Sequence, residues 1–219
     1  MSNIRIDRIS LDHKPTLHKF LLNMMNALEF FKKSSGVWNS QRTTHHLAFK
    51  RAEKGGSKIT VEAFEKENPR IIELCQLHEV DPNLAIGGAY VSWCGTMQWD
   101  REEGEQHEGE TVFALVPDDE TGRNGRLLRE KGYAEVMPVV GHYEMDDEDG
   151  LVLTTDYETM SARERFWFPN DYTRVRTSTV KRFGGFSTAT FCTETRIGDT
   201  PTIENPDALS IPVPALFGW

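Results

Sequence analysis

The chain has 219 residues, a length that β-barrels commonly reach as one domain, so we expect a single main domain. Asp and Glu outnumber Lys and Arg by 34 to 25, and the formal net charge of −9 argues against nucleic acid or an anionic membrane as a partner, because both would repel the chain. The three cysteines are too few and too widely spaced for a disulfide framework, so we expect a reducing compartment.

The first part of the chain is predicted to be an arm followed by a helix. Residues 1–20 show no periodicity and are expected to form a poorly ordered N-terminal arm. From Leu21 to Lys33 the apolar residues recur at helical spacing, and Ser34-Ser35-Gly36 supplies a C-terminal stop. No run reaches the ~18 apolar residues that a transmembrane helix needs, so we expect no membrane insertion.

After this helix the pattern changes to strands. Residues 37–51 and 57–65 are predicted to be strands, with Gly55-Gly56 as the hairpin turn between them. Asn68-Pro69 then predicts the start of a short helix, because Asn is a good N-cap and Pro is tolerated in the first turn.

The rest of the chain predicts a meander of strands and short turns. Turn residues occupy 146–150 and 169–171, and the proline-rich residues 198–219 are expected to form a C-terminal extension. Closing such a meander into an antiparallel barrel would remove its exposed edges, so we expect one barrel over residues 21–197. The predicted strands are 87–99, 110–117, 133–145, 151–160, 163–169, 172–182 and 186–197.

The segment 172–182 contains the most informative charges. Alternation along a strand places Arg174, Arg176 and Ser178 on one face. If that face points inward, the two guanidinium groups need anionic partners, and a ligand with two carboxylates would supply them. The alternative is an outer face, where both arginines meet water or pair with carboxylates of the barrel.

A second face carries large side chains. Trp93, Met97 and Trp99 share one side of the strand 87–99, where they could bracket a flat conjugated ligand. An ordinary aromatic core is the alternative, and it predicts that the interior is filled without a cavity.

Carboxylates are the third feature. Glu164 and Glu194 stand inside predicted strands, where an inward carboxylate could accept hydrogen bonds from the N–H groups of a ligand. The same carboxylates could instead be counter-ions of Arg174 and Arg176, or could face water. His45-His46 point to opposite faces of a strand and have no third ligand at zinc-like spacing, so we expect no metal site.

Several stretches together resemble the S/U-type phycobiliprotein lyases, a family of bilin chromophore lyases, and they occur in the family's order. They are Trp38-Asn39-Ser40-Gln41-Arg42-Thr43-Thr44-His45-His46, Val91-Ser92-Trp93 with Thr96-Met97-Gln98-Trp99, Gly125-Arg126-Leu127-Leu128-Arg129-Glu130, Tyr157-Glu158-Thr159-Met160, and Arg174-Val175-Arg176-Thr177-Ser178 followed by Lys181-Arg182-Phe183-Gly184-Gly185-Phe186.

The resemblance implies an all-β, lipocalin-like (calycin) closed barrel with an N-terminal helix and a short helix between early strands. It implies that Arg174, Arg176 and Ser178 hold the propionates of a bilin. It also implies that Trp93, Trp99 and Met97 line the pocket, and that Glu164 and Glu194 contact the pyrrole nitrogens as catalytic groups. Trp38 and Arg42 belong to the family's first strand, without an evident role.

The activity that follows from the resemblance is thioether attachment of a bilin, such as phycocyanobilin, to a cysteine of a phycobiliprotein α or β subunit. The bilin would be a transient ligand and not a permanent cofactor. A non-catalytic bilin carrier and a regulatory subunit of a heteromeric lyase are the alternatives, and a related lyase subunit or a second copy is a possible partner. The resemblance places the protein in the cyanobacterial cytosol, or in the stroma if it is plastid-derived.

Overall fold

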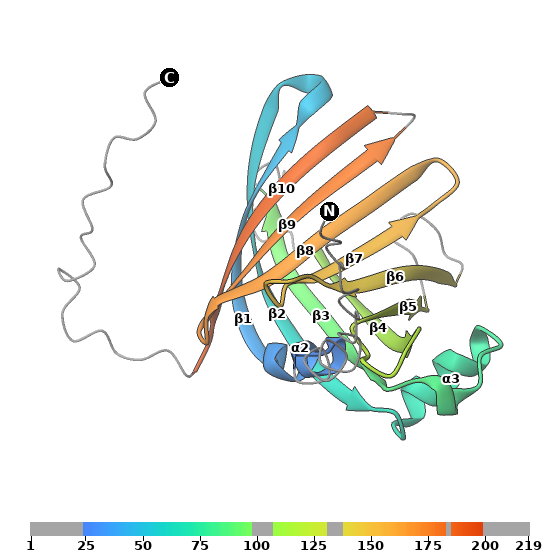
Figure 1. Cartoon of the computed structure of the whole chain (residues 1–219). Helices are drawn as coiled ribbons and strands as arrows, with labels where there is room; N and C mark the ends of the chain where they lie inside the picture. The colour runs from blue at the N-terminus through green and yellow to red at the C-terminus, as the bar shows by residue number, and fades with distance from the viewer. Residues whose placement is uncertain (1–23, 98–106, 131–137, 183–184, 199–219) are drawn as a thin grey trace, which may run out of the picture.

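The computed structural model describes residues 24–97, 107–130, 138–182 and 185–198, and these form a closed antiparallel barrel (Figure 1). Each strand pairs with the next along the chain, and β1 (Gly36–His46) pairs with β10 (Gly185–Arg196) to close the sheet. The predicted up-and-down barrel is therefore confirmed. The other strands are β2 (Arg51–Glu65), β3 (Gly87–Met97), β4 (His107–Pro117), β5 (Asn124–Arg129), β6 (Val139–Met145), β7 (Leu151–Asp156), β8 (Met160–Asn170) and β9 (Thr173–Arg182).

In the described part of the chain two α-helices accompany the barrel, as the sequence predicted. The helix α2 (Ala27–Ser34) crosses one end of the barrel, and α3 (Pro69–Leu77) lies outside it (Figure 1). Asn68 caps α3 by accepting a hydrogen bond from the backbone N–H of Arg70. The apolar side of α3 covers the outward residues of β4 and β5, which explains why Val112, Ala114 and Leu128 are buried on the outer face. None of the described helices has the length and apolar character needed to cross a membrane.

Three predictions about the strands are wrong in detail. The hairpin turn is not Gly55-Gly56 but Leu47–Phe49 with Lys50 in the left-handed region, and both glycines lie inside β2. A strand at 124–129 was missed, and within the described residues the strand predicted at 133–145 starts at Val139, while residues 131–137 lie outside the described part. The segment 151–160 holds all of β7 and the first residue of β8, because the turn between them falls at 157–159.

Position 55 lies inside a strand, and its glycine provides space for a neighbouring side chain and does not form a turn. A Cβ at this position would come within 2.8 Å of Arg42 Nε on the neighbouring strand, so the missing side chain makes room for that guanidinium group. The helix at 21–33 is confirmed only from Ala27, with Asn26 as its N-cap, while residues 21–23 lie outside the described part. The arm at 1–20 and nearly all of the extension at 198–219 also lie outside it and stay predictions.

Candidate functional site

The helix α2 closes one end of the barrel interior because both of its ends are fixed. At its N-terminus Asn26 and Glu29 form a reciprocal capping box. At its C-terminus the Arg196 guanidinium donates to the carbonyl oxygens of Lys33 and Ser35 at 2.6 and 2.5 Å. Gly36 follows with φ of +125°, where a Cβ would meet this guanidinium at 2.8 Å. The helix is therefore held across the barrel end by the last strand.

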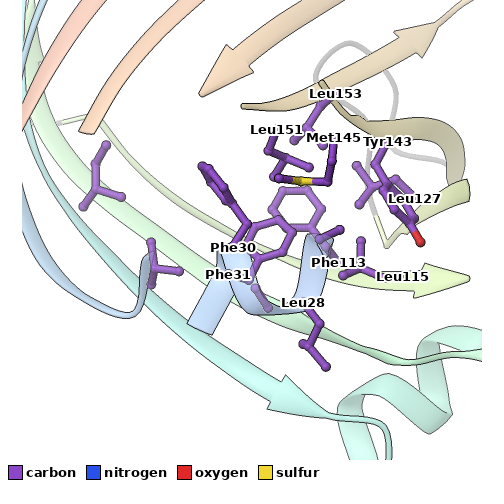
Figure 2. Packing of buried hydrophobic residues seen from close by; sticks show 14 of the residues in the cluster. Leu28, Phe30, Phe31, Phe113, Leu115, Leu127, Tyr143, Met145, Leu151 and Leu153 are labelled. Carbon is purple, nitrogen blue, oxygen red and sulfur yellow. The ribbon is translucent and has the colours of Figure 1, made fainter. Parts of the chain in front are cut away.

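This anchoring directs two phenylalanines of α2 into the barrel. Phe30 and Phe31 lie among Phe113, Met145 and Leu151, which come from three different strands (Figure 2). The Phe31 and Phe113 rings stack with centroids 6.0 Å apart. These side chains form an apolar floor at the helix end of the barrel.

Above this floor lies a cavity of about 310 Å³. Its walls come from α2 and from strands on all sides of the barrel, so the interior is hollow and not packed solid. Most of the lining is apolar or aromatic, and the polar exceptions are arginines, glutamates and serines. The lining residues are Phe30, Phe31, Ser34, Arg42, Ser57, Ile59, Val61, Val91, Trp93, Phe113, Leu151, Leu153, Glu164, Phe166, Arg174, Arg176 and Glu194.

Arg174 and Arg176 both face this cavity, and both meet carboxylates of the barrel. Arg174 Nε donates to Glu194 Oε2 at 2.5 Å, and the two side chains are 6% and 0% exposed. Arg176 Nη1 donates to Glu164 Oε1 at 3.3 Å, while Arg176 Nε lies 3.7 Å from Glu194 Oε1. The arginines therefore point inward and not to the outer face, and Glu194 and Glu164 are their counter-ions inside the barrel.

The electrostatics of this cluster follow from its burial. Removal from water lowers the pKa of Arg174, and the neighbouring Glu194 opposes that shift. The Arg174 guanidinium also lies 4.8 Å from the centroid of the Trp38 ring, a favourable cation–π geometry. Trp38 is fully buried and donates its indole N–H to the Ser34 carbonyl oxygen at 2.8 Å, so it ties the arginine cluster to α2.

Arg42 is a third guanidinium in the cavity lining, and sequence reasoning did not assign it a role. It makes no hydrogen bond or ion pair with any described residue. Three arginines against two glutamates leave the described lining with one positive charge in excess. The signal in the sequence was its alternation with Trp38 and Ser40, which are both buried on the same face of β1.

The aromatic part of the predicted site is described in part. Trp93 lines the cavity, and its ring occupies space that exists because residue 109 on the paired strand is glycine. A Cβ on Gly109 would come within 2.4 Å of the Trp93 ring. Met97 ends β3 on the same inward face, but its side chain lies outside the described part, as does Trp99.

Ser178 lies on β9 opposite Glu164, two residues beyond Arg176 on the inward face, and is half-buried. It is not among the residues that line the cavity. Cys192 is buried behind Arg176, which donates to its Sγ at 3.3 Å. Burial raises the pKa of this thiol, so it is a poor nucleophile near neutral pH.

The histidine pair is separated as expected, and His46 lies 2.7 Å from the carboxylate of buried Glu53. No cluster of three or more potential metal ligands occurs among residues 24–97, 107–130, 138–182 and 185–198.

Comparisons with known proteins agree on one family. A family model described as CpeS-like protein matches residues 26–197. Phycocyanobilin lyase subunit CpcS from Picosynechococcus sp. is 59% identical over 194 residues, which cover 89% of this chain and 98% of that protein. Chromophore lyase CpcS/CpeS 2 from Trichodesmium erythraeum is 55% identical over 197 residues, covering 89% and 100%. The solved S-type phycobiliprotein lyase CPES from Guillardia theta superposes with a TM-score of 0.69 at 33% identity, covering 84% of this chain and 98% of that one.

Proposed function

The chain belongs to the CpeS-like protein family, and we propose that it is a chromophore lyase that binds an open-chain tetrapyrrole in its barrel and promotes its attachment to a cysteine of a phycobiliprotein subunit. The observation that carries this proposal is a cavity that combines aromatic walls with three guanidinium groups. A bilin is a flat conjugated molecule with two propionate arms, and it matches both properties.

Phycocyanobilin is the bilin that we propose, because the 59% identical relative is named a phycocyanobilin lyase subunit. Its propionates would bind Arg174 and Arg176, with Ser178 as a further hydrogen-bond donor at the open side. Guanidinium groups form bidentate hydrogen bonds with carboxylates, and such bonds are strong where water is excluded. Arg42 would contact a propionate or a ring carbonyl oxygen, since it brings the uncompensated charge of the lining.

Binding of the propionates would be an exchange of partners. In the ligand-free barrel Glu194 and Glu164 hold Arg174 and Arg176. When a propionate takes an arginine, the glutamate is released to accept hydrogen bonds from pyrrole N–H groups. Glu194 Oε1 accepts no hydrogen bond from a described residue, although it is buried, so it already offers an acceptor to such a donor.

The chemical step adds the thiol of the acceptor protein across the exocyclic double bond of ring A. Sulfur bonds to the ethylidene carbon, the proton ends on the adjacent ring carbon, and no oxidant or leaving group is involved. Glu164 and Glu194 would stabilise a protonated tetrapyrrole, which makes the ethylidene carbon more electrophilic. The barrel contributes further by holding a flexible ligand in one conformer with ring A accessible, while Trp93 and the proposed Met97 and Trp99 cover the ring faces.

The proposal is tested by adding phycocyanobilin to the purified protein and recording the absorbance spectrum. A sharpened, red-shifted band is expected, and Arg174→Ala with Arg176→Ala should abolish it. Removing arginines alone leaves their buried glutamates without a counter-ion and can destabilise the fold. The variant Arg174→Gln with Glu194→Gln removes both charges of one ion pair, so it should fold better than the double alanine variant. It should weaken binding at least tenfold. Arg163→Ala, on the exposed outward side of β8, is the matched control and should bind as the wild type.

Catalysis is separated from carriage by transfer assays. Apo-phycobiliprotein α and β subunits are mixed with phycocyanobilin with and without the protein, and adduct rate, yield and stereochemistry are compared. A lyase raises the rate and gives one stereoisomer over several turnovers. A carrier would bind the bilin without changing the rate of attachment.

The assignment of the propionates is contradicted if Arg174→Ala with Arg176→Ala and Arg174→Gln with Glu194→Gln both give the same bilin spectrum as the wild type.

A further inference from the structure

One side of the barrel exterior has a charge opposite to that of the whole chain. The outer face of β9, β10, β1 and β2, together with the turn Leu47–Lys50, is called the basic wall here. In the described parts of these four strands the outward positions carry Lys54, Lys58 and Lys181, and their only carboxylate is Glu62, near the helix end. The whole chain, by contrast, has 34 acidic residues against 25 basic ones. The basic wall is therefore an electropositive surface on an acidic protein.

The same wall exposes large apolar side chains. Phe49 in the turn is 75% exposed, Leu47 beside it is 46% exposed, and Phe191 on β10 is 51% exposed. Phe191 borders an external groove of about 750 Å³ that also involves Thr43, Lys54 and Gly56. A Cβ at Gly56 would meet only one backbone atom, at 3.6 Å, so the glycine leaves the wall hollow and does not relieve a clash. Exposed aromatic residues beside a groove are typical of a protein-binding surface.

The apolar and basic residues continue to the open end of the barrel. Lys50 in the turn after β1 and Arg51 at the start of β2 are exposed, as is Arg182 at the end of β9. The turn Leu47–Phe49 contacts β10, which pairs with β9, so these tips are neighbours. Because α2 closes the opposite end, a ligand would enter and leave past these tips.

The wall also stands directly behind the arginines of the cavity. Phe191 precedes Cys192, which pairs with both Arg42 and Arg176, and Phe191 itself pairs with Thr43. Arg42 lies four residues before the end of β1, a distance of about 13 Å along a strand. A protein bound to the wall and the tips would therefore reach the mouth of the cavity within the length of a short loop.

We propose that the basic wall is the docking surface for the acceptor protein, and that the acceptor binds it through an acidic surface with a small apolar contact. This proposal rests on the proposed function, because it names the site at which the thiol-bearing substrate of that reaction docks. Charge complementarity brings the acidic face of the acceptor to the wall, Phe49 and Phe191 supply the apolar contact, and the acceptor cysteine is directed towards ring A at the open end.

Two variants test the charged and the apolar parts separately. Lys50→Glu with Arg51→Glu reverses the charge at the tip, and Phe191→Thr replaces the aromatic ring by the residue type that dominates the neighbouring outward positions. The matched controls are Lys66→Glu with Arg70→Glu, which reverses exposed charges near α3, and Leu84→Ser, which removes an exposed apolar side chain near the same helix. All variants are first checked for an unchanged phycocyanobilin spectrum, since none of them alters the cavity lining.

Direct binding to apo-phycocyanin α and β subunits is measured by biolayer interferometry without bilin, and transfer kinetics are measured in parallel. Both wall variants should raise Kd and the KM for the acceptor about tenfold, with kcat at saturating acceptor within twofold, and the controls should match the wild type. Binding of the wild type should weaken in 0.5 M salt.

Wall variants that bind the acceptor like the wild type, or controls that weaken it equally, would overturn the docking proposal while bilin binding and transfer remain intact. A wild type that binds neither subunit would overturn it as well. If light scattering shows a wild-type dimer that Phe191→Thr dissociates, the wall holds a second copy and the proposal is wrong. If phycocyanobilin gives no sharpened, red-shifted band with the wild type, the proposed function is contradicted instead. The interferometry would still decide whether the acceptor docks on the wall.

Discussion

The buried pair Arg174–Glu194 makes a quantitative prediction about what holds the empty barrel together. The variant Glu194→Gln keeps the size of the side chain and removes its charge. Arg174 is 6% exposed and Glu194 is 0% exposed, so water does not replace the lost carboxylate. Arg174 also stays between the Trp38 and Phe166 rings, at 4.8 and 5.8 Å from their centroids, which leaves it little freedom to turn towards solvent.

The magnitude follows from the cost of a buried charge without its partner. Removing one member of a buried ion pair typically costs about 3–5 kcal/mol. Glutamine still offers a carbonyl oxygen to Arg174, so we expect the lower end of this range, about 3 kcal/mol. In a domain of this size 1 kcal/mol corresponds to about 2–4 °C in Tm, which predicts a decrease of about 6–12 °C.

The assay is urea unfolding at pH 7, followed by tryptophan fluorescence and far-UV circular dichroism, with Tm from calorimetry. Glu158→Gln, in the exposed turn between β7 and β8, is the matched control, and its stability should differ from that of the wild type by less than about 0.5 kcal/mol. The double variant Arg174→Met with Glu194→Leu should recover most of the loss, because two apolar side chains of similar volume leave no buried charge.

A Glu194→Gln variant within about 1 kcal/mol of the wild type would refute this reasoning, because Arg174 would then not depend on Glu194 for compensation. The same stability difference, measured with bound ligand, is a second test. With saturating phycocyanobilin, a propionate can replace Glu194 beside Arg174, so the difference between wild type and variant should become smaller. A difference that stays constant would mean that the propionate does not reach Arg174.

Three further predictions follow from other parts of the barrel. Burial acts to raise the pKa of Asp146, but hydrogen bonds from Arg165 and two backbone N–H groups outweigh it and hold that pKa below its usual range. Its stabilisation is therefore present above the unfolded-state pKa near 4 and is lost as pH falls through the folded-state pKa. Asp146→Asn should cost about 1–2 kcal/mol in urea unfolding at pH 7, and this cost should decrease steadily as the pH is lowered below about 4. The variant Gly109→Ala should displace the Trp93 ring and weaken phycocyanobilin binding at least tenfold in absorbance titrations, whereas Gly185→Ala, which has no atom within 4 Å of the added Cβ, should bind normally. A thiol reagent at pH 8 should modify only half-exposed Cys94 rapidly, and the two buried thiols should react only after denaturation; rapid modification of more than one thiol in the native protein would contradict their burial.

Alternation along β9 predicted that Arg174, Arg176 and Ser178 share one face, but it left open whether that face points inward. It could not predict which carboxylates meet these arginines. Arg174 is opposite Glu194 and Ser178 is opposite Glu164 only because of the registers of β8, β9 and β10, and both ladders contain irregular steps. Register depends on how the whole barrel closes, which local patterns do not encode.

The misplaced hairpin turn has a different cause. A Gly-Gly pair favours a turn when the chain is considered locally. In the folded barrel, a Cβ at Gly55 would come within 2.8 Å of the Arg42 guanidinium on the neighbouring strand, so the glycine gives that side chain room. Arg42 was overlooked as a cavity residue because its alternation with Trp38 and Ser40 shows only that the three share a face, and not that this face borders a cavity.

A pocket that carries its own counter-ions solves a problem that a transfer protein faces. Guanidinium groups buried without anions would destabilise the empty barrel, so a purely cationic pocket would depend on its ligand for folding. Glu194 and Glu164 remove that dependence. Under the proposed function, each propionate that binds would displace one of them, and the displaced carboxylate would need a new donor. The free energy of binding is therefore the difference between two similar sets of ion pairs, and affinity stays moderate even though each contact is strong. A moderate affinity is what release to an acceptor requires, since a carrier that binds its cargo too tightly slows the transfer. Among the described residues Arg42 has no glutamate to displace, so its positive charge would attract a dianionic ligand without a further exchange of ion-pair partners.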